Sequence, residues 1–282
     1  MWQSLYLCSN DPEYTQQHIA PTLSEVIAAA GYTAYDPFGG VPGKAYADVL
    51  RLFVGPIDDG GWLRIISEGG KSGGILDAIK AAFSGALVDT LCLSLALEGA
   101  TATITAYQSG EAIPTVDALT PYLRDGKSRA DLEHALSAQI STVQAVGDDD
   151  EGVPLSALPD DVQAMADKLN PKQINKMFNK FMGRVSRQLG GDNPDGESVR
   201  DLLKGQAPNW ESAGGMRLRA LAGCITLAKW RTPDFVTLRD AYQVHNRRRR
   251  NPKAHLYPGD AEAMQAVPDA LAYVPVYGGK GV

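Results

Sequence analysis

The chain has 282 residues, 44% of them hydrophobic and 21% charged, and this composition is that of an ordinary globular protein. It excludes a fibrous repeat and a chain that is disordered throughout. The net charge of -6 at pH 7 is unevenly distributed along the chain. Residues 1–145 carry 8 Lys and Arg against 16 Asp and Glu, whereas residues 146–282 carry 19 against 17. An acidic front half and a mildly basic back half predict two domains with different partners.

The front half alternates β-like runs with helical patterns. The β-like runs lie at residues 3–9, 47–68 and 90–110, and the helical patterns lie at residues 21–31, 75–87 and 121–146. Turn residues at 58–61 divide the second β-like run, and Glu98-Gly99 divides the third, so each predicts a hairpin. Hairpins with covering helices indicate an α+β domain with a mainly antiparallel sheet over residues 1–145.

The back half is predicted to be a mostly α-helical domain over residues 153–282, joined to the front by an acidic linker at 146–152. Its helical patterns lie at residues 170–191, 198–205, 214–230 and 232–250. Thr232 is expected to cap the last of these, and Pro252 should end it near Arg250. The proline-rich tail predicts short helical turns and an extended end that packs on the helices.

Membrane, metal and cofactor sites are not expected. The chain has no stretch of about 18 uncharged apolar residues, and its first residues lack the pattern of a secretory signal, so we expect a cytoplasmic protein. Cys8, Cys92 and Cys224 lie far apart in apolar surroundings, which predicts buried thiols and no metal site. Gly70-Lys71-Ser72 looks like the end of a P-loop, but Ile65 occupies the position of its first glycine, so no nucleotide cofactor is predicted.

A stripe of cations recurs at every fourth position of the helix predicted at residues 170–191. Its members are Lys172, Lys176, Lys180 and Arg184. This spacing places them on one helix face, and no acidic residue lies among them to form an i,i+4 ion pair. The face is therefore either a solvated surface or a site for an anion. Nucleic acid is the anion that we expect, and an acidic protein surface is the alternative.

A second cationic cluster lies at the predicted end of the helix at residues 232–250. Its members are Arg247, Arg248, Arg249, Arg250 and Lys253. The carbonyl groups at a helix C-terminus favour one or two cations, but four consecutive arginines exceed this need. Because the chain turns into Pro252, the guanidinium groups can spread towards a phosphate backbone.

The same segment suggests a catalytic alternative. Residues 250–255, RNPKAH, resemble the R-x4-H signature of HEPN ribonucleases, which are helical enzymes that cleave RNA without a metal. The resemblance implies that Arg250 stabilises the scissile phosphate, that His255 acts on the 2′-hydroxyl or the leaving group, and that Asn251 orients them. A chance match, with His255 a histidine in a loop, is the other interpretation.

Trp230, between Lys229 and Arg231, suits either stacking on a single-stranded base or a place in the core. Taken together, the patterns predict a non-enzymatic, nucleic-acid-binding component of a larger assembly, whose helical domain contacts RNA or DNA through phosphates. The negative front domain should repel nucleic acid and meet a protein partner. The alternatives are a metal-independent ribonuclease that uses Arg250 and His255, and a purely structural or protein-interaction component.

Overall fold

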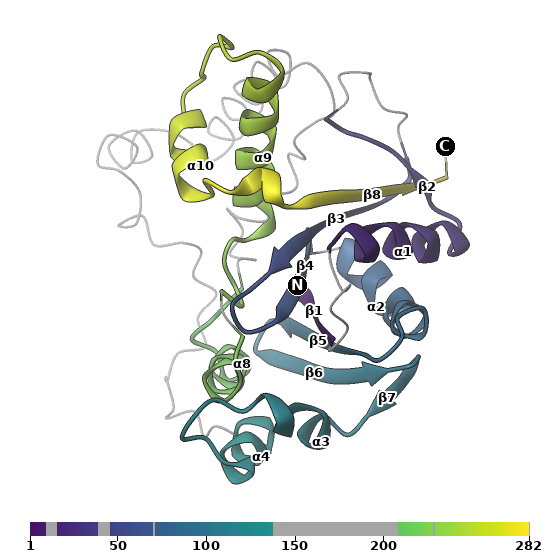
Figure 1. Cartoon of the computed structure of the whole chain (residues 1–282), viewed down its shortest axis with the longest axis vertical. Coiled ribbons are helices and arrows are strands. Elements are labelled where there is room, and N and C mark those ends of the chain that lie inside the picture. Colours follow the sequence, from purple (N-terminus) through teal and green to yellow (C-terminus); the bar gives the residue numbers. More distant parts are fainter. Residues whose placement is uncertain (10–15, 39–45, 70, 138–207, 228, 282) are drawn as a thin grey trace, which may run out of the picture. The chain divides into compact units, whose positions relative to one another are not determined.

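An eight-stranded antiparallel sheet organises the part of the chain that a computed structural model describes, which is residues 1–9, 16–38, 46–69, 71–137, 208–227 and 229–281 (Figure 1). Its strands are β1 (Trp2–Ser9), β2 (Thr33–Ala34), β3 (Asp48–Ile57), β4 (Trp62–Ser67), β5 (Thr90–Glu98), β6 (Thr101–Gln108), β7 (Glu111–Ile113) and β8 (Val274–Lys280). They lie in the order β2-β8-β3-β4-β1-β5-β6-β7, and every neighbouring pair is antiparallel. The predicted α+β class and antiparallel sheet are confirmed.

The helices cover both faces of this sheet. The α-helices are α1 (Gln16–Ala29), α2 (Lys71–Gly85), α3 (Thr115–Leu119), α4 (Arg129–Ser137), α8 (Ala213–Cys224), α9 (Phe235–Arg250) and α10 (Asp260–Ala266), and the 3-10 turns are η1 (Thr120–Tyr122) and η3 (Ala270–Ala272). None of the helices in the described ranges combines the length and the apolar character that crossing a bilayer requires.

The predicted hairpin turns form as their residues suggest. One carboxylate oxygen of Asp58 accepts hydrogen bonds from the backbone N–H groups of Gly60 and Trp62, both at 2.9 Å. This arrangement closes the turn between β3 and β4. Between β5 and β6, Gly99 adopts a positive φ of 55°, a conformation that glycine tolerates without steric strain.

Strand β1 contributes side chains to two hydrophobic cores, one on each face of the sheet. Successive side chains of a strand point to opposite faces of the sheet. Leu5 and Leu7 therefore pack with residues of α1 and α2, whereas Tyr6 and Cys8 pack with residues of α4 and α8. The sheet is thus the middle layer between two groups of helices (Figure 1).

A third core lies between α9 and the β3–β8 part of the sheet. Phe53 and Tyr277 face α9 from the sheet, and Phe235 and Leu238 face them from the helix. Phe53 is completely buried. Its ring centroid lies 5.5 Å from that of Phe235 and 6.0 Å from that of Tyr277. This aromatic contact fixes the position of α9 against the sheet.

The end of the chain corrects one prediction. We expected an extended tail packed on helices, but Val274–Lys280 is strand β8, which pairs with β3 on one side and with β2 on the other. A Cβ on Gly278 would lie 2.9 Å from Cγ2 of Ile27 in α1, so glycine lets the helix approach the strand closely. The described part of the predicted helical domain is therefore joined to the front half through the sheet. The domain boundary predicted at residues 146–152 lies outside the described residues and stays a prediction.

Helix α9 begins two residues later than the sequence suggested. The predicted cap, Thr232, is wrong, because the side chain of Asp234 accepts a hydrogen bond of 2.9 Å from the backbone N–H of Thr237. The predicted end near Arg250 is confirmed, since Asn251 leaves the helical conformation with φ -139° and ψ 97°.

A buried arginine on β4 connects the sheet to the segment that leads into α9. The guanidinium of Arg64 donates to the hydroxyl of Ser4 at 3.1 and 3.2 Å and to the carbonyl groups of Lys229 at 3.3 Å and Pro233 at 3.1 Å. Arg64 is only 8% exposed, and in the described ranges no carboxylate forms an ion pair with it. Its charge is stabilised, without being neutralised, by these neutral acceptors and by the Trp2 ring, whose centroid lies 5.9 Å from the guanidinium carbon.

The three cysteines are buried free thiols, as their apolar surroundings predicted. Burial raises the pKa of the Cys92 thiol to about 12, and it also raises the pKa of Cys8 and of Cys224. Because the thiolate is the reactive form, we expect a thiol reagent at pH 8 to label all three far more slowly in the folded protein than after unfolding. The absorbance of Ellman's reagent measures this. Labelling of a thiol in the folded protein at the rate of free cysteine would contradict it.

Candidate nucleic-acid interface

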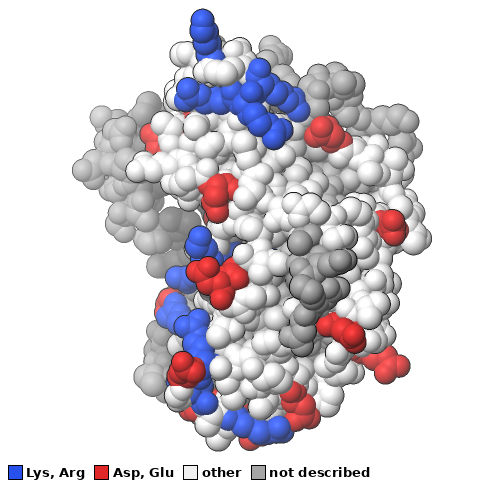
Figure 2. All heavy atoms as spheres, in the orientation of Figure 1, with Lys and Arg blue, Asp and Glu red and all other residues white. Residues whose placement is uncertain are grey.

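The end of α9 presents a cluster of cations that we call the arginine corner. Its members are Arg248, Arg249, Arg250 and Lys253. Figure 2 shows Lys and Arg side chains gathered over this end of α9. The corner forms because Asn251 ends the helix, and its side-chain oxygen then accepts a hydrogen bond of 3.2 Å from the backbone N–H of Lys253. The resulting tight turn keeps Lys253 near the last helical turn.

Arg247 has a different environment from the corner. Its guanidinium forms an ion pair with Asp260 of α10 and donates to the carbonyl of His255 at 3.3 Å. The guanidinium carbon also lies 4.9 Å from the centroid of the Tyr257 ring. Arg247 therefore joins α9 to the segment around α10, and its predicted contact with phosphate stays a prediction.

The corner itself has no acidic partner in the described part of the chain. Arg249 donates to the side-chain oxygen of Asn246 at 3.0 Å, and Arg250 donates to the backbone carbonyl of Phe38 at 2.6 Å. No described carboxylate forms an ion pair with any of the four cations. The α9 dipole offers roughly half a negative charge at this end, which offsets only part of four positive charges. The corner thus keeps a positive potential that attracts anions.

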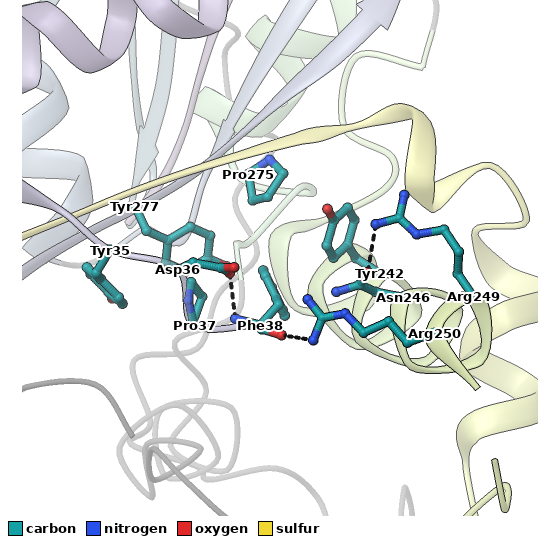
Figure 3. Close-up of a pocket in the computed structure, with 10 residues that line it drawn as sticks. All are labelled: Tyr35, Asp36, Pro37, Phe38, Tyr242, Asn246, Arg249, Arg250, Pro275 and Tyr277. Carbon is teal, nitrogen blue, oxygen red and sulfur yellow. Dashed lines mark hydrogen bonds between the residues drawn. The ribbon is translucent and has the colours of Figure 1, made fainter. Parts of the chain in front are cut away.

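A pocket of about 190 Å³ lies beside the corner (Figure 3). Residues of three separate chain segments line it: Tyr35, Asp36, Pro37, Phe38, Tyr242, Asn246, Arg249, Arg250, Pro275 and Tyr277. The centroids of the Phe38 and Tyr242 rings are 4.8 Å apart, and those of Phe38 and Tyr277 are 5.7 Å apart. The pocket therefore combines aromatic surfaces with two guanidinium groups.

The charges around the pocket are few at neutral pH. Burial raises the pKa of Tyr242, and the Asp36 carboxylate raises it further, while Arg249 and Arg250 act in the opposite direction. Burial also raises the pKa of Tyr277, whose buried hydroxyl has no hydrogen-bond partner in the described ranges. Both tyrosines are therefore neutral, and the charged groups that line the pocket are two arginines and Asp36.

The three residues of the ribonuclease hypothesis have separate hydrogen-bond partners in the described part of the chain. Arg250 lines the pocket, whereas His255 is exposed and lies beside the Tyr257 ring, with centroids 5.5 Å apart. The side chain of Asn251 is used within the turn. No hydrogen bond joins Arg250 to His255 in the described part of the chain. Catalysis by this set stays a prediction to which the geometry adds no support.

The other predicted contacts have different outcomes. The stripe of Lys172, Lys176, Lys180 and Arg184 lies outside the described residues and stays a prediction. Trp230 packs in a cluster of tryptophans, with its ring centroid 5.2 Å from that of Trp210. This is the core placement, because both rings pack against the buried residues of one hydrophobic core.

No sequence pattern predicts the side of the pocket formed by residues 35–38. The segment YDPF contains two aromatic rings, but its position opposite the end of α9 depends on contacts between residues more than 200 positions apart. No local pattern reports such a contact, so the rings had no visible link to the arginines.

Neither a metal site in the described residues nor a similarity to a known protein indicates the function. Within the described ranges, no group of three or more His, Cys, Asp or Glu side chains is placed to hold a metal ion. The chain matches no protein family, no curated protein and no solved structure, so its function is argued from the geometry of this site alone.

Proposed function

We propose that this protein binds nucleic acid through phosphate groups at the arginine corner, as a non-enzymatic component of a larger assembly. The observation that carries the proposal is that four clustered cations have neutral partners or none, and no ion-paired carboxylate, among the described residues. The adjacent Arg247 shows the contrast, because Asp260 already balances its charge.

A chain of phosphate groups suits the corner better than single small anions do. The four cations repel one another, and a polyanion that spans the cluster relieves this repulsion at several points at once. Each phosphate that a cation neutralises also releases counterions from the nucleic acid, which favours binding at low salt. A folded acidic protein offers carboxylates at less regular spacing and remains the alternative occupant.

The remaining parts of the functional hypothesis are also proposals. Outside residues 35–38, which line the pocket beside the corner, the acidic front half repels nucleic acid and is suited to a protein partner in the assembly. Location in the cytoplasm remains a prediction. Cleavage of RNA in the presence of EDTA that is lost on His255→Ala, with binding retained, would favour the ribonuclease instead.

Charge reversal of Arg248 and Lys253 together tests the proposal. Neither residue lines the pocket, so the substitutions leave its walls intact. We expect affinity for a labelled single-stranded oligonucleotide at about 0.1 M salt to fall at least tenfold, because two phosphate contacts become repulsive. The slope of log affinity against log salt should flatten by about 1.4, at roughly 0.7 per lost contact. Fluorescence anisotropy over a range of salt concentrations measures both quantities.

A matched control distinguishes binding at the arginine corner from an effect of the protein's net charge. Reversal of Lys127 and Arg219 changes the net charge by the same amount away from α9. Lys127 is exposed, and the ion pair that Arg219 forms among the described residues, with Glu211, is exposed as well, so little stability is lost. The control should bind as the unmodified protein does. Equal losses in both variants would assign the binding to overall charge and refute the proposal for the corner.

A further inference from the structure

We infer that the pocket beside the arginine corner receives one base of a single-stranded nucleic acid, while the corner holds the neighbouring phosphates. This inference rests on the proposed function and names its ligand class. Its starting point is that aromatic rings, two guanidinium groups and one carboxylate meet in a single hollow (Figure 3).

The size of the pocket favours part of a ligand over a whole one. Its volume of about 190 Å³ is below the roughly 300–1,000 Å³ typical of sites that enclose a complete small molecule. One planar ring system of a longer chain fits this limit. The rest of that chain would then lie outside, where Arg248 and Lys253 extend the positive surface beyond the residues that line the pocket.

The walls combine exposed polar groups with a smaller apolar area that can contact a base. Phe38 contributes a ring from the segment at residues 35–38, and Tyr242 contributes one from α9. Pro37 and Pro275 add rigid apolar surface. Aromatic side chains stack on the face of any base, so such a pocket tolerates different sequences. The guanidinium planes of Arg249 and Arg250 can add cation–π contacts at its rim.

The polar groups place the base inside and the phosphate outside. One oxygen of the Asp36 carboxylate accepts the backbone N–H of Phe38 at 2.8 Å, which leaves the other as an acceptor for a base amino group. This negative charge offsets one of the two guanidinium charges of Arg249 and Arg250, so a phosphate gains less inside the pocket than beside Arg248 and Lys253. The amide nitrogen of Asn246 is a donor that its bond with Arg249 does not use, since that bond engages the side-chain oxygen.

Entry of a base selects for single strands. A base in a duplex is stacked and paired on both sides, and removing it from the stack costs free energy that an unpaired base does not require. Duplexes can still meet the corner through phosphates. We therefore expect single strands to bind more tightly than duplexes of equal length.

Abasic oligonucleotides test the inference without changing the protein. An oligodeoxythymidylate and an abasic strand of equal length carry the same number of phosphates, so both should bind at the corner. We expect the strand with bases to bind between about fivefold and 100-fold more tightly, which is the usual effect of one stacked base. Anisotropy titrations at matched salt give the two affinities.

Protein variants test whether the preference for base-bearing strands arises in the pocket. Phe38→Leu and Tyr242→Leu keep apolar volume but remove a ring, and each should reduce the preference for bases while leaving the salt slope unchanged. Circular dichroism and thermal melting check that each variant is folded. The Arg248→Glu/Lys253→Glu protein should lose affinity for both strands and keep their ratio.

The outcomes distinguish the inference from the proposed function. Equal affinities for the abasic and the base-bearing strands in the unmodified protein would overturn the inference and leave phosphate binding intact. A duplex that binds as tightly as the single strand would overturn it as well. Binding of neither strand at low salt would overturn both.

Discussion

Replacement of Phe53 by alanine is expected to lower the free energy of unfolding by about 3–5 kcal/mol, the usual cost of removing a large aromatic ring from a core. Phe53 is completely buried, and its ring touches the aromatic side chains that hold α9 on the sheet. Urea unfolding followed by circular dichroism measures the change.

The effect of this substitution should reach the pocket. The Phe53 centroid lies 5.5 Å from that of Tyr242 and 6.4 Å from that of Phe38, two rings of the pocket wall. Affinity for the base-bearing strand should therefore fall more than affinity for the abasic strand. Ile57→Ala on the same strand is the control, since Ile57 is 42% exposed and should cost less than about 1 kcal/mol. A similar small cost for Phe53→Ala would show that the third core does not hold α9.

Replacement of Arg64 by methionine is expected to lower the free energy of unfolding by about 2–4 kcal/mol. Methionine keeps much of the apolar stem but removes every donor, which leaves the carbonyls of Lys229 and Pro233 without this partner. The two carbonyls are partly buried and the Ser4 hydroxyl is completely buried, so each acceptor left unsatisfied costs up to about 1–3 kcal/mol, and relief from burying a charge offsets part of the sum. Thermal and urea unfolding give the change.

Two comparisons sharpen the Arg64 result. Arg64→Lys keeps the charge but lacks the planar fork that reaches Ser4 and both carbonyls, so its loss should fall between those of the methionine variant and the unmodified protein. Arg51→Met is a second reference for the removal of an arginine, because Arg51 forms an ion pair with the Glu68 carboxylate at 2.8 Å, whereas Arg64 donates to neutral acceptors. If Arg64→Met were as stable as the unmodified protein, the carbonyls of Lys229 and Pro233 would have to be satisfied by water.

Local pattern was enough for the hairpins and for the end of α9, whereas the helix predicted at residues 214–230 ends at Cys224 and the one predicted at 21–31 begins at Gln16. Asp58 and Gly99 act within their own turns, and Pro252 acts on the residues just before it, so short stretches contain the required information. The same holds for the arginine corner, whose four members are close neighbours in the sequence. These features were therefore predicted and are found in the structure.

Features that depend on distant contacts were not predicted. Strand β8 contains Pro275, Gly278 and Gly279, which lower β propensity, and it is a strand because β3 and β2 lie on either side of it. The Asp234 cap was missed because Thr232 and Asp234 are both good capping residues and tertiary contacts choose between them. The pocket was missed for the same reason as β8, since its wall at residues 35–38 meets α9 only after folding.

The position of β8 has a consequence for how the protein is made. Leu52 of β3 pairs with Val276, roughly 220 residues later in the chain. At a synthesis rate of about 5–20 residues per second, β3 emerges from the ribosome roughly 10–45 seconds before its partner. During that interval one edge of β3 has no hydrogen-bonding neighbour and is open to pairing with another nascent chain. The end of the sheet formed by β8 and β2 therefore depends on a late event, and a chaperone that shields this edge would raise the yield of folded protein.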